Sequence, residues 1–221
     1  MTEFKIENLL SLDKTIAKDL FCGVTYPFEV LSKISDFIKS LCEKLDPDEF
    51  IKRDEYIFVH KSAKVAPTAF IAGPCIIDEG AEIRHCAFIR GSAIVGKNAV
   101  VGNSTELKNV ILFDKVQVPH YNYVGDSVLG FGSHLGAGAI TSNVKSDKKL
   151  VVLRHKDTVI ETKLKKFGAI LGDNVEVGCN TVLNPGTMVG KNTNIYPLSM
   201  VRGIVPGGCI YKKQGEIVEK L

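Results

Sequence analysis

Apolar positions recur every six residues over most of this chain. Aliphatic residues occupy every sixth position through the first part of the repeat: Val65, Ile71, Ile77, Ile83, Ile89, Val95, Val101 and Leu107. Small residues stand two positions earlier: Ala63, Ala69, Cys75, Ala81, Ala87, Ala93, Ala99 and Thr105. The same phase returns at Leu171, Val177, Leu183, Val189, Ile195 and Val201. A period of six is neither helical nor a simple strand alternation, and it fits a short strand plus a turn repeated along a coil.

This repeat predicts an all-β fold, a parallel β-helix of hexapeptide repeats over residues 56–210. Each aliphatic side chain stacks on its counterpart in the next coil, and the small residue occupies the narrow part of the coil. Glycine often follows the aliphatic residue and serves the turns. Because one repeat buries little by itself, stability comes from stacking. A β-sandwich is the alternative, but its alternating strands would not hold a six-residue phase for so long.

The two ends of the chain lack the repeat. Residues 1–55 contain apolar positions at helical spacing after Pro27: Val30, Leu31, Ile34, Phe37, Ile38, Leu41 and Leu45. They predict an amphipathic helix that ends near Asp46-Pro47. We expect this helical segment to cap the open N-terminal end of the β-helix, which is otherwise an exposed edge. Residues 211–221 are polar and suit a short tail or a strand.

The repeat is also interrupted internally. Its phase slips by one residue around 113–124 and is lost over 142–167. Within that gap Lys149–Arg154 and Thr158–Lys163 predict the two strands of a protruding hairpin loop. Long loops that interrupt a regular scaffold often carry function. This loop is the most basic part of the chain, so we expect it to reach a neighbouring subunit or to cover a ligand groove. A solvated surface loop is the alternative.

Charge and composition narrow the partners. The net charge is +3, whereas nucleic-acid binders usually concentrate a stronger basic excess on one face. No apolar run reaches the roughly 20 residues of a membrane span, and the first residues lack the features of a signal peptide. The six cysteines form no CxxC pair and no zinc-ligand spacing. We therefore expect a cytoplasmic protein with free thiols that binds small phosphorylated ligands, and neither nucleic acid nor membrane.

Candidate chemistry lies where the repeat deviates. Arg90 follows one ladder position and Lys108 follows another eighteen residues later, so stacking brings both cations to one side of the coils. Converging cations suit a phosphate, although lone surface charges are usually just solvated. His120 lies at the phase slip and is a natural general base near neutral pH, or else it packs between coils. Tyr123 hydrogen-bonds a sugar or fills a groove.

The order of these residues resembles a known enzyme half. The chain reads Arg90, Glu106-Leu107-Lys108, HYNYVGD over 120–126 and GAGAITSN over 136–143. These pieces are similar, in order and spacing, to the acetyltransferase domain of the bifunctional enzyme that acetylates glucosamine 1-phosphate and then uridylylates it. The hairpin and the residues after it resemble related sugar-1-phosphate nucleotidylyltransferases. The resemblance covers roughly residues 58–206.

The resemblance implies a fold, an assembly and roles for individual residues. The β-helix of that family is left-handed, an exception to the usual handedness of crossovers, and it assembles as a homotrimer with active sites between neighbouring prisms. Arg90, Lys108 and Lys149 then hold the 1-phosphate of an amino sugar. Tyr123, His134 and Asn143 contact the sugar. His120 takes a proton as the 2-amino group attacks the thioester of acetyl-CoA, and Glu106 orients the amine. Ala137, Cys179 and Pro197 lie at the acetyl-CoA site.

Two departures from that family change the expected activity. The residues ahead of the repeat are too few for its pyrophosphorylase domain, so we expect no nucleotidyl transfer from this chain. A separate nucleotidyltransferase would then complete the synthesis of a nucleotide sugar such as UDP-N-acetylglucosamine. The family's Asn-Tyr-Asp-Gly is here Asn143-Val144-Lys145-Ser146, and His134 replaces an asparagine that contacts the sugar. The amino sugar, of glucosamine or galactosamine type, can therefore differ.

Two other functions compete with acetyl transfer. A non-catalytic sugar-phosphate-binding or regulatory module is favoured by the altered Asn143-Val144 motif and opposed by the presence of His120. A zinc hydratase of the γ-carbonic-anhydrase type uses the same kind of β-helix. It requires three histidine ligands, two of them five residues apart, and Gly125 stands where the second would be. We therefore expect no metal.

Overall fold

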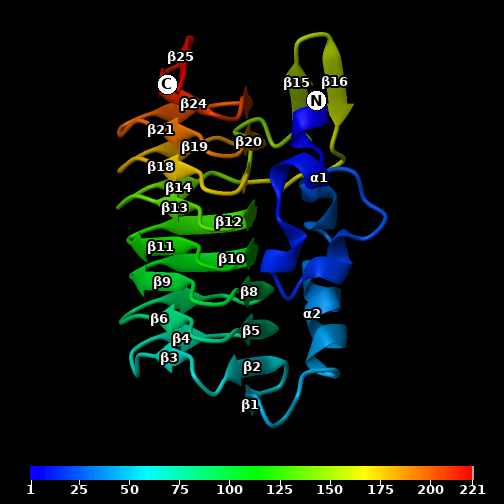
Figure 1. The fold of residues 1–221 in the computed structure, drawn as a ribbon, viewed down its shortest axis with the longest axis vertical. Helices are drawn as coiled ribbons and strands as arrows, with labels where there is room; N and C mark the ends of the chain where they lie inside the picture. The colour runs from blue at the N-terminus through cyan, green and yellow to red at the C-terminus, as the bar shows by residue number, and fades with distance from the viewer. Residues whose placement is uncertain (221) are drawn as a thin grey trace.

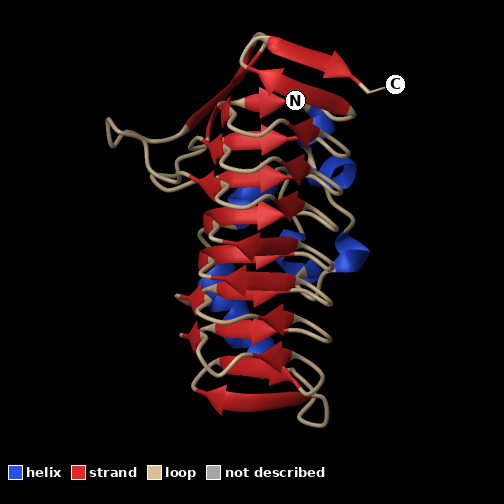
Figure 2. Cartoon of the chain, turned by 90° about the vertical axis from the view of Figure 1, so that its left-hand side faces the viewer, coloured by secondary structure: helices blue, strands red, loops and turns tan. Residues whose placement is uncertain are grey.

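The repeat forms a prism of stacked triangular coils. The computed structural model describes residues 1–220, and its strands rise along the prism in order (Figures 1 and 2). The first face consists of β2 (Ile57–His60), β5 (Cys75–Ile77), β8 (Ala93–Val95), the ends of β10 (Glu106–Leu112) and β12 (Tyr123–Leu129), β17 (Ala169–Leu171), β20 (Thr187–Val189) and β23 (Ile204–Val205). The second face consists of β3 (Lys64–Val65), β6 (Glu82–Ile83), β9 (Val100–Asn103), β11 (Gln117–His120), β13 (His134–Leu135), β18 (Glu176–Val177), β21 (Asn194–Ile195) and β24 (Cys209–Lys213). The third face consists of β4 (Phe70–Ile71), β7 (Phe88–Ile89), the starts of β10 and β12, β14 (Ile140–Thr141), β19 (Val182–Leu183) and β22 (Met200–Val201).

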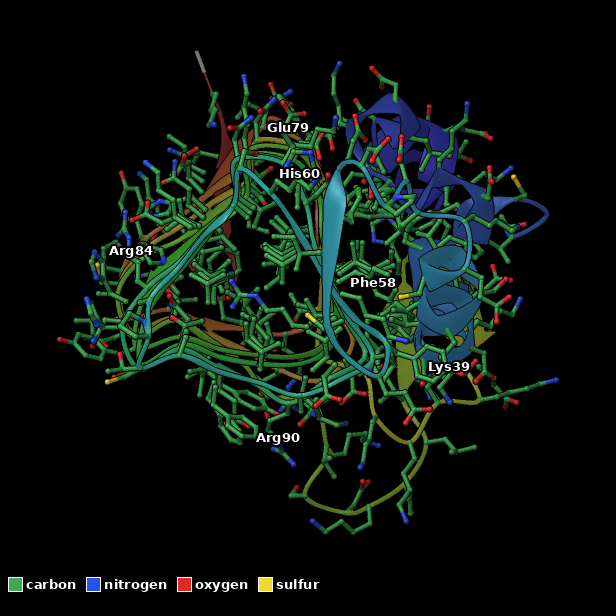
Figure 3. All side chains as sticks on the ribbon, turned by 90° about the horizontal axis from the view of Figure 1, so that it is seen from below. Lys39, Phe58, His60, Glu79, Arg84 and Arg90 are labelled. Atoms are coloured by element: carbon green, nitrogen blue, oxygen red, sulfur yellow. The ribbon has the colours of Figure 1, made fainter. Side chains whose placement is uncertain are left out.

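The period-six positions line the inside of the prism. Ile83, for example, pairs with Val65 in one neighbouring coil and Val101 in the other, and it is 1% exposed. Seen from the first coil, the chain passes from Glu79 through Arg84 to Arg90 counterclockwise as it recedes (Figure 3). The β-helix is therefore left-handed. The predicted fold is confirmed, including the handedness that only the resemblance implied.

Two successive coils are each one residue short at the same corner. Phe88 pairs with Glu106, eighteen residues on, whereas Ala93 pairs with Val110, seventeen residues on. The missing residue lies between Leu107 and Val110, where the chain turns from the third face to the first. The next coil repeats this shortening at Gly125-Asp126. The phase slip therefore begins earlier than the predicted residues 113–124. At this corner the step between successive inward residues is five instead of six, and this step is recognised only once the corner has been located.

The helical segment lies along the first face and does not cap the end of the prism. It comprises η1 (Thr2–Phe4), α1 (Ile6–Leu9), η2 (Leu12–Lys14), η3 (Lys18–Phe21), η4 (Pro27–Val30) and α2 (Ile34–Cys42). Starting near the C-terminal coils, it descends to β1 (Phe50–Asp54), which pairs with β2 as the edge strand (Figure 1). α2 packs on β5, β8 and β10. None of the helices in residues 1–220 is long and apolar enough to cross a membrane.

The outward residues of the first face explain this placement. They form an apolar row that is completely buried beneath the helical segment and the hairpin: Ile76, Ile94, Ile111, Val128, Ile170 and Met188. A helical segment placed over the open end would leave that row in water. Burial of apolar area therefore selects the face.

The internal interruption is a hairpin, as the sequence predicts. β15 (Val152–His155) pairs antiparallel with β16 (Thr158–Glu161), and the hairpin leaves the prism at the corner between the third and first faces. Its inner side is buried at Val151 and Leu153, while Phe4 lies edge-on to His155. Its basic side chains are exposed: Lys148, Lys149, Arg154, Lys156, Lys163, Lys165 and Lys166. The predicted C-terminal strand is present as β25 (Glu216–Glu219), paired with β24.

The other two faces differ in what they show to the outside. The outward row of the second face is mostly polar, including Lys64, Glu82, Gln117, Glu176 and Asn194. The outward row of the third face is apolar at both ends and polar only in the middle: Phe70, Phe88, Glu106, Tyr123, Ile140, Val182 and Met200. No helix packs on this third face within residues 1–220 (Figure 3).

Candidate active site

The candidate residues gather along both edges of the third face. We call the corner between the second and third faces the second corner, and the corner between the third and first faces the third corner. Arg90 and Lys108 occupy equivalent positions at the third corner, because the Arg90 backbone N–H donates to Leu107 O at 2.9 Å in the next coil. Stacking therefore brings the two cations together, as their eighteen-residue spacing predicts.

Arg90 reaches over the third face. Its Nη1 lies 2.7 Å from Oε1 of Glu106, an outward residue of that face. The hydrogen bond to this carboxylate holds the pKa of Arg90 above its ordinary value. Glu106 and Arg90 are about a third and a half exposed, so an incoming anion can compete with Glu106 for the guanidinium.

A buried carboxylate holds the rest of the third corner. Asp126 is 4% exposed and lies 3.1 Å from the ammonium nitrogen of Lys108. It accepts further hydrogen bonds from the side-chain amides of Asn109, at 2.9 Å, and Asn143. Asn109 and Asp126 are the left-handed residues of the two shortened turns, with φ of 54° and 48°. The shortening therefore places these polar side chains together beneath Lys108.

Tyr123 leans toward the same corner. Asn143 Nδ2 donates to its hydroxyl oxygen at 3.2 Å. The ring lies over Gly125, since a Cβ there would come within 2.5 Å of that oxygen. Burial, with the negative charges of Asp126 and Glu106, raises the pKa of Tyr123, so its hydroxyl stays protonated and keeps a hydrogen to donate.

The second corner carries His120. Its side chain is exposed, and its carbonyl accepts a hydrogen bond from Gly138 N–H at 3.0 Å in the next coil. The same corner-to-corner bond joins Asn180 N–H to Ala137 O at 2.8 Å and Leu198 N–H to Cys179 O at 2.9 Å. The equivalent positions of successive coils are therefore His120, Ala137, Cys179 and Pro197. The histidine and the three residues expected at acetyl-CoA form one continuous edge.

The third face separates the histidine from the cations. His120 and Gly125, which pairs with Lys108, are five residues apart, so the corners are about 16 Å apart at most at about 3.3 Å per residue. The Arg90 side chain spans part of this width, and Glu106 and Tyr123 form the floor between the two corners. In a single chain, the surface between the two corners is exposed to solvent. Two cavities, of about 320 and 260 Å³, lie elsewhere: one between α2 and β1–β2, and one at the first corner, which joins the first and second faces.

Two expected site residues lie apart from this cluster. His134 belongs to the second face, and its Nδ1 is 2.8 Å from Oε2 of Glu176. Lys149 lies in the loop before β15, where its backbone N–H donates to Asp147 at 3.0 Å and its side chain is exposed. This loop projects from the third corner on the side where Arg90 lies (Figure 3). Within one chain neither side chain completes the cluster.

Sequence reasoning assigned no role to Asp126 or Asn109. Asp126 is part of the HYNYVGD motif, but its function depends on which donors surround it. Those donors come from two other turns of the chain. As for metals, no group of three His, Cys, Asp or Glu side chains suited to holding an ion occurs in residues 1–220.

Curated relatives confirm the resemblance drawn from the motifs. The chain is 34% identical over 213 residues to the bifunctional protein GlmU of Methanococcus vannielii, covering 88% of this chain and 47% of that protein. It is 34% identical over 112 residues to the bifunctional sugar-1-phosphate nucleotidylyltransferase/acetyltransferase of Sulfurisphaera tokodaii, covering 51% of this chain and 28% of that protein. The chain thus spans about half or less of these relatives.

A solved structure and a family pattern match the chain as well. The acetyltransferase domain of PglB from Neisseria gonorrhoeae, in complex with acetyl coenzyme A, matches 70% of this chain and 53% of that chain, with a TM-score of 0.40 and 17% identity. The pattern of the GMPPB C-terminal domain family matches residues 71–192, more than half of the sequence. The chain therefore belongs to the GMPPB C-terminal domain family.

Proposed function

We propose that this protein is an acetyltransferase that moves an acetyl group from acetyl-CoA to the 2-amino group of an amino-sugar 1-phosphate. The observation that carries the proposal is the third face itself. It has two cations along one edge, an exposed histidine along the other, and the polar pair Glu106 and Tyr123 between them. The relatives that match this chain over about half or less of their own length are named as bifunctional proteins, one of them a nucleotidylyltransferase/acetyltransferase.

In the proposed complex the third corner binds the phosphate. Arg90 exchanges its contact with Glu106 for a phosphate oxygen, and Lys108 offers the ammonium protons that Asp126 does not take. Lys149, from the loop above the corner, adds a third cation. Tyr123 donates to a sugar oxygen, and Asn143 accepts from a hydroxyl. Glu106, once released by Arg90, faces the amine and orients it.

The chemical step takes place at the second corner. His120 accepts a proton from the amine as its nitrogen bonds to the thioester carbonyl carbon. Backbone N–H groups near Ala137 or Cys179 stabilise the negative oxygen of the tetrahedral intermediate. The carbon–sulfur bond then breaks, and His120 returns the proton to the departing thiolate. The amide and coenzyme A are the products, and no covalent enzyme intermediate forms.

We extend the proposal to a homotrimer. The first face hides its outward apolar row beneath helices, and the second face presents polar residues to water. The third face has apolar residues toward both ends that no helix in residues 1–220 covers: Phe70, Phe88, Ile140 and Met200. Exposed apolar rows of this kind mark protein interfaces. A neighbouring prism over this face would close the open site and bring residues such as His134 or Lys149 to it.

The product would serve a separate nucleotidyltransferase in the cytoplasm. The decisive experiment follows thiol release from acetyl-CoA with a panel of amino-sugar 1-phosphates, including the glucosamine and galactosamine forms. Release that requires both the amine and the phosphate supports the proposal. If the protein binds a sugar phosphate but releases no thiol with any member of the panel, it is a non-catalytic binding module instead.

A further inference from the structure

Asp126 joins its own turn to two other parts of the chain through one carboxylate. Its oxygens accept hydrogen bonds from Lys108 on one turn, Asn109 on the same turn, and Asn143 at the start of the hairpin insertion. The amide nitrogen of Asn109 also donates to the Leu31 carbonyl of the helical segment at 3.0 Å. The Asp126 carbonyl in turn accepts Gly168 N–H, where the insertion rejoins the prism, at 2.8 Å. Both ends of the insertion are therefore attached at this residue.

The carboxylate itself is out of reach of a ligand. Asp126 is 4% exposed, whereas the side chain of Lys108 is 25% exposed. An ammonium group has three protons, and two carboxylate oxygens engage at most two of them. At least one proton is left for an external anion. Asn143 likewise directs its amide N–H₂ to Asp126 and Tyr123, which leaves its carbonyl oxygen for a ligand.

We infer that Asp126 is a positioning residue for sugar-phosphate binding, acting through Lys108 and Asn143. Both are flexible polar side chains that lose rotamer freedom when they grip a ligand. The buried carboxylate imposes that order before the ligand arrives, so binding requires less reorganisation. This inference rests on the proposed function, because it assigns Asp126 to the same phosphate site.

Asp126→Asn tests the inference with almost no change in shape. The amide has one acceptor oxygen for three donors, and its own N–H₂ opposes at least one of them. We expect the KM for the amino-sugar 1-phosphate to rise at least about tenfold, while the KM for acetyl-CoA changes by less than about twofold. The KM for acetyl-CoA should not respond to this substitution, because the proposed acetyl-CoA edge lies at the second corner, on the opposite side of the third face from Asp126.

Asp173→Asn is the matched control. Asp173 is also buried, pairs with Lys191 at 2.9 Å, and accepts hydrogen bonds from Ser11 and Phe131 N–H, but it lies at the first corner. It should lose comparable thermal stability and leave both KM values unchanged. If the two variants alter the KM values alike, Asp126 has only a structural role and the inference fails.

A double-mutant cycle shows whether the effect passes through Lys108. In a Lys108→Met background, Asp126→Asn should raise the sugar-phosphate KM by less than about threefold, because the ammonium group that Asp126 positions is already absent. Full additivity of the two changes overturns the inference.

Calorimetric binding of glucosamine 1-phosphate and of inorganic phosphate provides a readout that needs no turnover. A wild type that binds but does not acetylate overturns the proposed reaction, and the Asp126 inference is then decided by the same cycle in Kd. A wild type that binds neither phosphate overturns both.

Discussion

Serine at both Phe70 and Phe88 should dissociate the proposed trimer. The two rings pair in adjacent coils with centroids 5.6 Å apart, and they are 60% and 41% exposed. A phenylalanine buries about 200 Å², so the pair exposes roughly 200 Å² in one chain. At about 25 cal/mol per Å², a neighbour covering both rings gains roughly 5 kcal/mol per chain. Losing it weakens each contact by three to four orders of magnitude, to roughly micromolar if the native contact is subnanomolar.

Sedimentation velocity at a concentration about tenfold below that micromolar value measures this directly. We expect a trimer for the wild type and mostly monomer for Phe70→Ser/Phe88→Ser. Because both rings lie outside the core, the variant should keep its β-sheet circular dichroism. The control is Ile51→Ser/Ile217→Ser, two apolar residues that are 48% and 39% exposed on other elements, and it should stay trimeric. A wild type that sediments as a monomer, or a double serine variant that remains a trimer, refutes the reasoning.

Three further predictions concern the site and the core. His120→Ala should reduce acetyl transfer by at least about 10²-fold while leaving calorimetric binding of the sugar phosphate intact, and near-normal turnover would remove His120 as the base. Exposed Cys179 should react with maleimide in the folded protein, and coenzyme A should protect it. Cys42 and Cys75 should react only on unfolding, because burial raises the pKa of their thiols to about 11 and about 12. If mass spectrometry finds Cys179 equally labelled with and without coenzyme A, the cofactor binds elsewhere. Asp78 has a buried Oδ2 without a hydrogen-bond partner in the described chain, and burial raises its pKa. The folded state therefore holds this proton to higher pH than the unfolded chain, and stability falls as pH rises through that window. Asp78→Asn should raise the Tm at pH 7 and lose this advantage below pH 3.8, and a Tm difference from the wild type that is the same at both pH values would contradict this.

The interior of the prism was predictable because it obeys a local rule. Each coil repeats the same inward positions, so residues such as Ile77 and Val95 reveal the stack at a fixed interval. The hairpin was predictable for a similar reason, since its strands flank a tight turn. Neither required knowledge of contacts between distant segments.

The position of the helical segment was not predictable from its own residues. Its amphipathic pattern shows that it must pack on something apolar, but many surfaces satisfy that condition. The deciding signal lay elsewhere, in outward residues such as Ile94 and Ile111, which have no reason to be apolar on a solvated face. Reading inward and outward positions separately would have identified this face.

The site was predictable in part. The eighteen-residue spacing of Arg90 and Lys108 placed the cations together, whereas the carboxylate partner of Lys108, Asp126, depends on shortened corners that shift the register by one residue. Asp126 gains its three donors only after that shift. A single altered corner can therefore reorganise a site without changing any residue that contacts the ligand.

The hairpin insertion has a consequence for how such proteins diversify. Val128 pairs with Ile170 across a gap of forty-two residues, and on the far side the coils resume their regular eighteen-residue spacing, as in the pairing of Ile170 with Met188. The length of this loop is therefore uncoupled from the geometry of the prism on either side. Exchanging the loop between related chains should alter which sugar is accepted while the scaffold keeps its register. Substrate specificity can therefore change at this corner without any change in the β-helix.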